Sequence, residues 1–255
     1  MDKDRIIKNF SRYAAFYDKY ANIQYCAGQK LLRLVNGFCF ERPNILEIGC
    51  GTGNFTMLLR KCFTDADIFS FDISAQMVQL AKIKIKDGVN FFIADAEDKK
   101  LDFKDMDIVA ANSSFQWLEN LEQCLSRYKQ MLKKNGLFIF SIFGKGTFFE
   151  LDKILKLTNT NSRTASSCFL SKIELEQILK RVFITFYIEE LNIKEMYPSF
   201  LELLKKIKYT GVQGDSRGFY WDKKKINYAE GIYKQHFEDI TATYQIFLCK
   251  GLSQR

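Results

Sequence analysis

A glycine-rich loop between a predicted strand and a predicted helix constrains this chain more than any other feature. The loop reads Gly49-Cys50-Gly51-Thr52-Gly53; apolar residues 44–48 precede it, and residues 55–62 repeat apolar side chains at helical spacing. Glycine lets the chain turn sharply and lets the backbone approach a ligand closely. An acidic residue, Asp72, follows about 20 positions on, which completes the context of a ligand-binding glycine loop.

Strand patterns alternate with helix patterns through the first part of the chain. Such alternation predicts βαβ units and a parallel sheet. The predicted strands are 44–48, 68–71, 89–94, 107–111 and 137–143, and the predicted helices between them are 55–62, 75–86 and 119–133. Because parallel strands end at one edge of a sheet, the residues that close them should share one crevice. These residues are Gly49, Asp72, Asp95 and Asn112.

Helical patterns flank this alternating region on both sides. Two helices, 4–20 and 24–37, are predicted before it. After residue 145 we predict helices at 147–157, 171–180, 197–208 and 224–238, an exposed loop at 158–167, and strands at 181–191 and 241–249. The two late strands can pair antiparallel at the sheet edge. The expected fold is therefore an α/β, Rossmann-like, seven-stranded and mostly parallel sheet with helices on both faces.

Composition narrows the class of protein. The chain has 255 residues, 47% of them hydrophobic and 27% charged, which is typical of a globular protein. No segment is long and apolar enough to span a bilayer, and charges interrupt the N-terminus too often for a secretory signal. Seven cysteines form no CxxC pair, and there is one histidine. We expect a cytoplasmic protein with reduced thiols, no metal site and no membrane partner.

The spacing of the glycines separates two possible ligands. A dinucleotide fingerprint has the spacing GxGxxG, whereas this loop is GxGxG and follows Glu47. The pattern resembles motif I of class I S-adenosylmethionine-dependent methyltransferases. The resemblance implies that the loop lies against the methionine part of the cofactor and that Asp72 accepts both ribose hydroxyls. It also implies that Asp95 and Ala96 contact the adenine, and that Asn112 contacts the methionine end.

S-adenosylmethionine is accordingly the expected cofactor. The cofactor-binding residues that the resemblance implies are Tyr13, Glu47, Gly49, Cys50, Gly51, Gly53, Asp72, Ile73, Met77, Asp95, Ala96 and Asn112. The alternative is a plain parallel-sheet domain with glycine turns.

The motifs of nucleic-acid methyltransferases are missing after the fourth predicted strand. Amino-directed enzymes carry an Asn/Asp-Pro-Pro-aromatic motif there, but this chain reads Asn112-Ser113-Ser114-Phe115. The Pro-Cys nucleophile of pyrimidine C5 enzymes is also absent, since the two prolines precede Asn44 and Ser199. The net charge of +8 indicates an acidic partner, but no catalytic motif points to nucleic acid.

The flanking segments resemble one methyltransferase family over nearly the whole chain, the malonyl-acyl carrier protein O-methyltransferases of biotin synthesis. The similar segments are 10–21 with Gln24, 114–117, 143–144, 147–151, 204–211 and 243–248. Glu47 departs from the pattern, because many relatives have Asp there. This resemblance implies methylation of the free carboxylate of a malonyl thioester on acyl carrier protein. A carboxyl group with a pKa of about 4 is ionised at pH 7, so that reaction needs orientation and no general base.

The same resemblance implies roles for particular residues. Tyr17 stands on the N-terminal helix that the family folds over the cofactor and is the candidate to shape the methyl-transfer site; a half-buried core tyrosine is the alternative. Gln116 and Trp117 follow the fourth strand and are candidates to line the acceptor channel, with a core position as the alternative for Trp117. Residues 205–225 hold seven cationic and two acidic side chains, a local balance of +5, and could receive an acidic carrier protein. Within this run, Arg217 is the candidate carboxylate binder. A solvated helix face is the alternative reading of the run.

We therefore expect one methyltransferase domain over residues 1–255. It comprises an N-terminal helical lid (1–40), a cofactor-binding core (41–145), and acceptor-side helices with the last two strands (146–255). One alternative is a methyltransferase for another small acceptor, such as a quinone. A second is a non-catalytic protein that binds RNA with a steep salt dependence.

Overall fold

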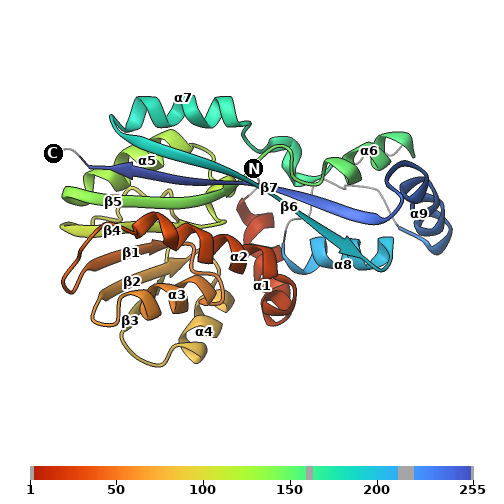
Figure 1. Ribbon diagram of the computed structural model, residues 1–255. Helices are drawn as coiled ribbons and strands as arrows, with labels where there is room; N and C mark the ends of the chain where they lie inside the picture. The colour runs from red at the N-terminus through yellow and green to blue at the C-terminus, as the bar shows by residue number, and fades with distance from the viewer. Residues whose placement is uncertain (1–2, 159–162, 212–220, 254–255) are drawn as a thin grey trace.

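Seven strands form one sheet in the order β3-β2-β1-β4-β5-β7-β6 (Figure 1). The computed structural model describes residues 3–158, 163–211 and 221–253. Five strands are parallel, namely β1 (Asn44–Ile48), β2 (Asp67–Asp72), β3 (Val89–Ile93), β4 (Met106–Asn112) and β5 (Leu132–Phe143). The last two, β6 (Phe186–Tyr197) and β7 (Ile240–Leu252), pair antiparallel at the edge. The mostly parallel Rossmann-like sheet predicted from the sequence is confirmed.

Helices precede, connect and follow these strands. Those of the first half are α1 (Lys3–Tyr20), α2 (Asn22–Leu31), α3 (Asn54–Cys62), α4 (Ala75–Lys84) and α5 (Leu121–Gln130). Those of the second half are α6 (Phe149–Leu157), α7 (Lys172–Val182), α8 (Phe200–Tyr209) and α9 (Lys223–Phe237). Three short 3₁₀ helices complete the described structure: η1 (Leu32–Val35), η2 (Phe115–Trp117) and η3 (Ala165–Cys168).

The core lies on both faces of the sheet. Successive side chains of a strand point to opposite faces, so alternate residues of β1, β4 and β5 serve two clusters. On one face, Ile45 and Ile108 pack with α2 and α3; on the other, Leu46 and Val109 pack with α5 and α7. The central strands are buried on both sides, which explains their continuous apolar sequence.

The long edge strands carry a second group of helices. β6 and β7 pair over their full length, from Phe186 opposite Gly251 to Tyr197 opposite Ile240, whereas β5 pairs only with the part of β7 from Ile246 onward. In Figure 1 the part of the β6–β7 pair that extends beyond β5 lies to the right of the parallel strands, among α6, α8 and α9. The lobe they form lies beside the ends of the parallel strands.

Several features differ from the sequence prediction. β5 begins at Leu132, inside the helix predicted at 119–133, and α5 ends at Gln130. The strand predicted at 181–191 begins later, because Leu175, Leu179 and Val182 form the buried stripe of α7. The helix predicted at 24–37 ends at Leu31 and continues as η1. In the loop predicted to be exposed, Thr164 and Ser166 are buried; the Thr164 hydroxyl donates to the Asp152 carboxylate at 2.8 Å.

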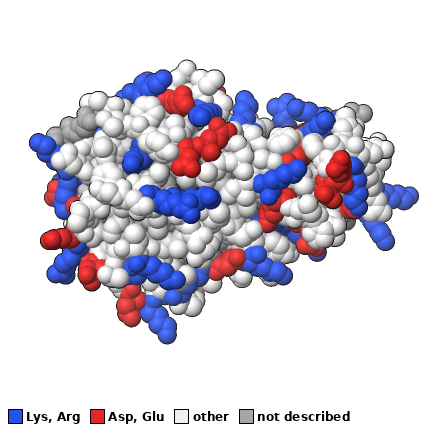
Figure 2. Space-filling view, viewed as in Figure 1, with Lys and Arg blue, Asp and Glu red and all other residues white. Residues whose placement is uncertain are grey.

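Charges of both signs are mixed on one face of the molecule. Figure 2 shows Lys and Arg interspersed with Asp and Glu on the face seen in Figure 1. In the described part of the chain, no helix is long and apolar enough to cross a membrane. Those same residues contain no cluster of three His, Cys, Asp or Glu side chains that could hold a metal ion.

Candidate functional site

A cavity lies at the carboxyl ends of the parallel strands, with α1 across it. It encloses about 1030 Å³ of space, part of which is open to solvent. The predicted site residues that line it are Tyr17, Gly49, Cys50, Gly51, Asp72, Ile73, Met77, Asp95, Ala96 and Asn112. The strand ends therefore meet in one place, as the parallel topology requires.

The glycine loop forms the floor of this cavity. The backbone N–H groups of Gly49 and Cys50 both donate to the Phe71 carbonyl, at 2.8 and 2.9 Å, which ties the loop to β2. Gly49 has φ +78°, and a Cβ there would lie 2.5 Å from the Ser114 side chain. Gly51 has φ +52° and open space where its Cβ would be. The loop thus requires glycine for conformation at both positions and leaves room for a ligand beside Gly51.

Asp72 closes β2 beside that loop. Its two carboxylate oxygens accept backbone N–H groups from Gly51 and Ser74, each at 2.9 Å. Burial raises the pKa of Asp72, while those N–H groups act in the opposite direction. Each oxygen retains acceptor capacity, because a carboxylate offers about four lone-pair positions. Asp72 can therefore accept hydroxyl groups from a ligand in the cavity.

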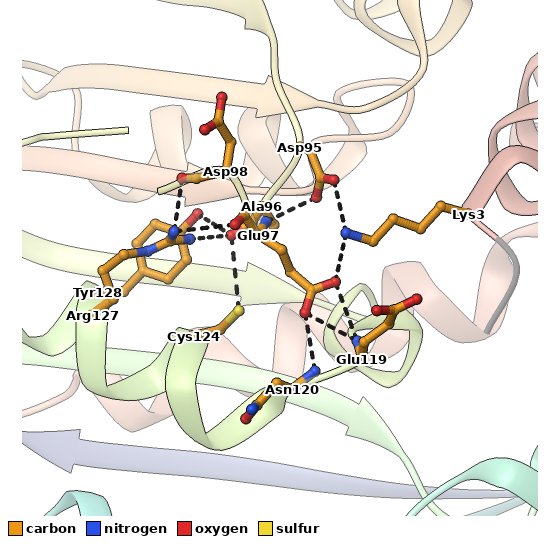
Figure 3. A network of polar contacts seen from close by, with 10 residues as sticks. All are labelled: Lys3, Asp95, Ala96, Glu97, Asp98, Glu119, Asn120, Cys124, Arg127 and Tyr128. Carbon is orange, nitrogen blue, oxygen red and sulfur yellow. Dashed lines mark hydrogen bonds and ion pairs between the residues drawn. The ribbon is translucent and has the colours of Figure 1, made fainter. Parts of the chain in front are cut away.

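The turn after β3 is held by a dense set of polar contacts (Figure 3). Lys3 of α1 forms ion pairs of 2.8 Å with both Asp95 and Glu97. These contacts raise the pKa of Lys3 above its usual value, although burial acts to lower it. On the other side of the turn, the Ala96 carbonyl accepts hydrogen bonds from Tyr128, at 2.8 Å, and from Arg127. The turn is fixed, and α1 is anchored to it.

The Asn112 side chain, at the end of the fourth strand, holds α2 against β4. The Asn112 side chain donates to the backbone carbonyl of Gln24 at 2.9 Å and accepts from the Ser141 hydroxyl at 2.6 Å, so α2 is tied to β4. Gln24 lines the cavity and is 7% exposed, yet its Oε1 has no hydrogen-bond partner among the described residues. An unpaired buried amide oxygen costs free energy, so this atom is suited to a ligand's donor.

Aromatic side chains close the cavity. Tyr17 of α1 lines the cavity; burial, with the nearby Asp72 and Asp18 carboxylates, raises its pKa, so the phenol stays protonated. Phe10 of α1 lies edge-on to Trp117, with ring centroids 5.7 Å apart. These rings give the site an apolar wall that restricts water.

Four predicted site residues among those that the structure describes do not line the cavity. Tyr13 faces the other way and packs edge-on against Tyr209. Glu47 is buried below the loop, where it accepts hydrogen bonds of 2.6 Å from Thr56 and Ser70. Gly53 begins α3 with φ +86°. Gln116 is buried in η2 and donates to the Ser113 carbonyl at 2.7 Å, and Arg217 lies outside the described residues.

Several polar residues that line the cavity were absent from the predicted site, among them Lys3 and Gln24; the others are Thr52, Asn54, Glu97, Ser113 and Ser114. Gln24 stands in one of the segments that carry the family resemblance, which was the available signal. No sequence signal singled out Lys3, because a lysine in a charged N-terminal segment is most often solvated.

Comparisons with known proteins identify the family. A family model described as a methyltransferase domain matches residues 46–140, which contain the glycine loop and the ends of β2, β3 and β4. Malonyl-acyl carrier protein O-methyltransferase 2 of Ilyobacter polytropus is 35% identical over 242 residues, which are 93% of this chain and 92% of that protein. The chain belongs to the malonyl-acyl carrier protein O-methyltransferase family.

Solved structures agree with this membership at the level of the fold. The YcgJ protein of Bacillus subtilis aligns over 90% of this chain and 98% of its own, with a TM-score of 0.63 and 14% identity. Phosphoethanolamine N-methyltransferase 2 of Haemonchus contortus, solved with S-adenosylhomocysteine, aligns over 89% of this chain and 52% of its own, with a TM-score of 0.57 and 18% identity. This member of the malonyl-acyl carrier protein O-methyltransferase family has the fold of a class I methyltransferase, and its methyl donor is S-adenosylmethionine.

Proposed function

We propose that this chain transfers the methyl group of S-adenosylmethionine to the free carboxylate of a malonyl thioester on acyl carrier protein. The product is the malonyl methyl ester, a primer for the route to biotin that the family resemblance implies. The observation that carries the proposal is the 35% identity to a malonyl-acyl carrier protein O-methyltransferase over nearly the full length of both chains. The alternative is a methyltransferase for another small acceptor.

The cavity has suitable partners for each part of the cofactor. Asp72 would accept the ribose hydroxyls, and Asp95 with Ala96 would contact the adenine. The glycine loop, Asn112 and the unpaired Gln24 oxygen would face the amino-acid end. The Gln24 oxygen gives the sharpest test of fit, because a ligand ammonium there satisfies a buried acceptor that the described residues leave without a donor.

Methyl transfer to a carboxylate requires the protein mainly to position the acceptor oxygen next to the methyl group of the cofactor. When bound, S-adenosylmethionine supplies a methyl group on a cationic sulfur: a carboxylate oxygen forms the new O–C bond, the C–S bond breaks, and S-adenosylhomocysteine leaves. No proton is transferred, so no base is required; His236 is exposed on α9, with its Nδ1 at 3.0 Å from the Ile232 carbonyl. Tyr17 would orient the acceptor with its protonated hydroxyl, while Phe10 and Trp117 limit water around the carboxylate.

The direct test is methyl transfer from labelled S-adenosylmethionine to malonyl-acyl carrier protein. Acetyl-acyl carrier protein serves as the control, because it lacks the free carboxylate. We expect base-labile label on the malonyl thioester and none on the acetyl thioester. Binding of S-adenosylhomocysteine without label on the malonyl thioester would overturn the acceptor assignment and favour another small-molecule acceptor.

A further inference from the structure

The outer face of α1 carries cations around one exposed aromatic ring. Lys8, Arg12, Phe16 and Lys19 follow one another at spacings of four, four and three residues, which places them on one face of the helix. All four are exposed, and Phe16 is 51% exposed. Phe16 is therefore a half-exposed aromatic ring among cations, on a helix that also lines the cavity.

Helix α8 supports this face from the side. The Tyr209 ring contacts Tyr13, Phe16 and Tyr20 of α1, with centroids 5.5, 5.1 and 4.9 Å apart. The exposed Lys208 lies over the Tyr13 ring at 5.4 Å. We call the side chains that this contact joins the basic patch: Lys8, Arg12, Phe16, Lys19 and Lys208.

The charges of the basic patch are available to a partner. Within residues 3–158, 163–211 and 221–253, none of its four cations forms an ion pair with a carboxylate. The neighbouring lysines of α8 differ: Lys205 pairs with Glu202 at 2.7 Å, and Lys206 is buried against Glu195 at 3.0 Å. Within the basic run predicted from the sequence, Lys206 is therefore a correction, because it is buried and does not belong to the exposed surface.

The position of the basic patch relates it to the cavity. Ile6, Phe10 and Tyr17 project from the inner face of α1 into the cavity, whereas the basic patch covers its outer face and the adjoining end of α8. A partner seated on the patch would lie one helix away from the site, within reach of a tethered substrate. Aromatic and arginine side chains are enriched at protein interfaces, and a cationic surface complements an acidic partner.

From this arrangement we infer that the basic patch is the docking surface for the acidic acyl carrier protein that presents the malonyl thioester. The inference rests on the proposed function. The carboxylates of the carrier would pair with the four cations, which raises the rate of encounter and sets the orientation. Phe16 would pack against apolar side chains of the carrier at the centre of the contact.

Charge reversal tests this surface directly. The variant Arg12→Glu/Lys208→Glu should weaken binding of malonyl-acyl carrier protein, measured with S-adenosylhomocysteine bound, by roughly tenfold or more. The matched control, Lys134→Glu/Lys180→Glu, makes the same change of net charge at exposed sites near the start of β5 and at the end of α7. It should change the carrier affinity less than about twofold, and neither variant should change the affinity for S-adenosylhomocysteine.

Each other outcome contradicts the inference. Equal weakening in both variants would show a response to net charge only, and no weakening would remove the patch from the interface. Patch-dependent binding to vesicles containing phosphatidylglycerol, without carrier binding, would assign the patch to a membrane surface instead. Transfer to S-malonyl-pantetheine separates the two proposals: if the wild-type protein methylates it but does not bind the carrier, the activity stands and the docking surface fails.

Discussion

Gln24 is a buried polar residue whose side-chain oxygen has no hydrogen-bond partner among the described residues. Its side chain is 7% exposed and lines the cavity. We predict that Gln24→Leu weakens S-adenosylhomocysteine binding by roughly tenfold, since a hydrogen bond to a charged group contributes about 1.5–3 kcal/mol. Isothermal titration calorimetry measures that affinity without an acceptor substrate.

A shorter ligand gives the control for this variant. Methylthioadenosine has the nucleoside and the sulfur of the cofactor product but lacks its amino-acid end. Gln24→Leu should bind it within about twofold of the wild-type affinity, because the lost amide does not face that part. The variant Gln116→Leu removes an equally buried amide that does not line the cavity, and both affinities should stay unchanged. Equal losses for both ligands in Gln24→Leu would reduce its role to packing.

Glu47 supports the loop with a carboxyl group that is fully buried. Burial raises its pKa to about 7, against the hydrogen bonds from Ser70 and Thr56. The folded state therefore holds a proton that the unfolded state has lost between about pH 4.5 and 7, so this group makes the free energy of unfolding fall as pH rises through that window.

The variant Glu47→Gln should remove that contribution. We expect the wild-type free energy of unfolding to decline more steeply between pH 5 and 7 than that of the variant, by up to about 1.4 kcal/mol per pH unit. Urea unfolding at a series of pH values measures the difference, and the exposed Glu41→Gln should keep the wild-type slope. Parallel curves for wild type and Glu47→Gln would show that Glu47 is already ionised below pH 5.

The strand-end residues were predictable, whereas the residues supplied by helices were less so. Gly49, Asp72, Asp95 and Asn112 meet because the carboxyl ends of parallel strands share one edge, whatever the details of packing. Tyr13 and Tyr17 stand on one helix, and only the angle at which α1 crosses the cavity decides that Tyr17 faces inward and Tyr13 packs on Tyr209. Tertiary packing sets that angle, and helical periodicity does not encode it.

At the scale of elements, α1 is fastened across the cavity at three places. Lys3 binds the turn after β3, the Ser11 hydroxyl bonds the Ser74 hydroxyl at 2.9 Å, and the Asp18 carboxylate holds the start of α3 and the end of α4. Asp18 accepts from Thr52 and Asn54 and pairs with Lys84 at 2.7 Å. These contacts are polar and partly exposed, so α1 belongs to the less stable part of the domain.

We predict that Asp18→Ala loosens the last two turns of α1. Amide exchange there should accelerate by roughly tenfold in the ligand-free protein, and S-adenosylhomocysteine should reduce the difference by adding contacts to the cavity face. Hydrogen exchange with mass spectrometry resolves this region. Asp4→Ala, on the exposed first turn of the same helix, is the control and should leave the last turns unchanged. Equal exchange in Asp18→Ala and wild type would show that apolar contacts alone hold α1.

The edge strands show which element boundaries the sequence can define. Residues 181–191 are rich in β-formers, but Val182 completes the buried stripe of α7, so the helix extends into the predicted strand. β6 then continues through polar residues as far as Tyr197, because an edge strand with one paired neighbour tolerates them on its exposed face. The hydrophobic content of the sequence is enough to predict β6, but the packing of α7 determines where β6 begins.

At the scale of the whole molecule, an ion pair between a buried lysine and a partly buried glutamate joins the edge strands to the helices beside the cavity. Lys206 of α8 is 5% exposed and lies 3.0 Å from the Glu195 carboxylate of β6. Asn22 of α2 donates to Glu195 at 2.7 Å, and Tyr197 adds a further hydrogen bond. Burial lowers the pKa of Lys206, which Glu195 opposes. The sequence alone groups Lys206 with the cations of residues 205–225 that could form a surface.

We predict that Lys206→Met destabilises the protein by about 2 kcal/mol or more, because it leaves Glu195 charged in a largely enclosed position. The double variant Lys206→Met/Glu195→Gln should lose less than the sum of the two single changes, since it removes both charges together. Urea unfolding of the four proteins gives the coupling free energy directly. The exposed Lys208→Met is the matched control on the same helix and should change stability by less than about 0.5 kcal/mol. Additive losses would show that Lys206 and Glu195 act independently and that the edge strands and α8 are held by apolar packing alone.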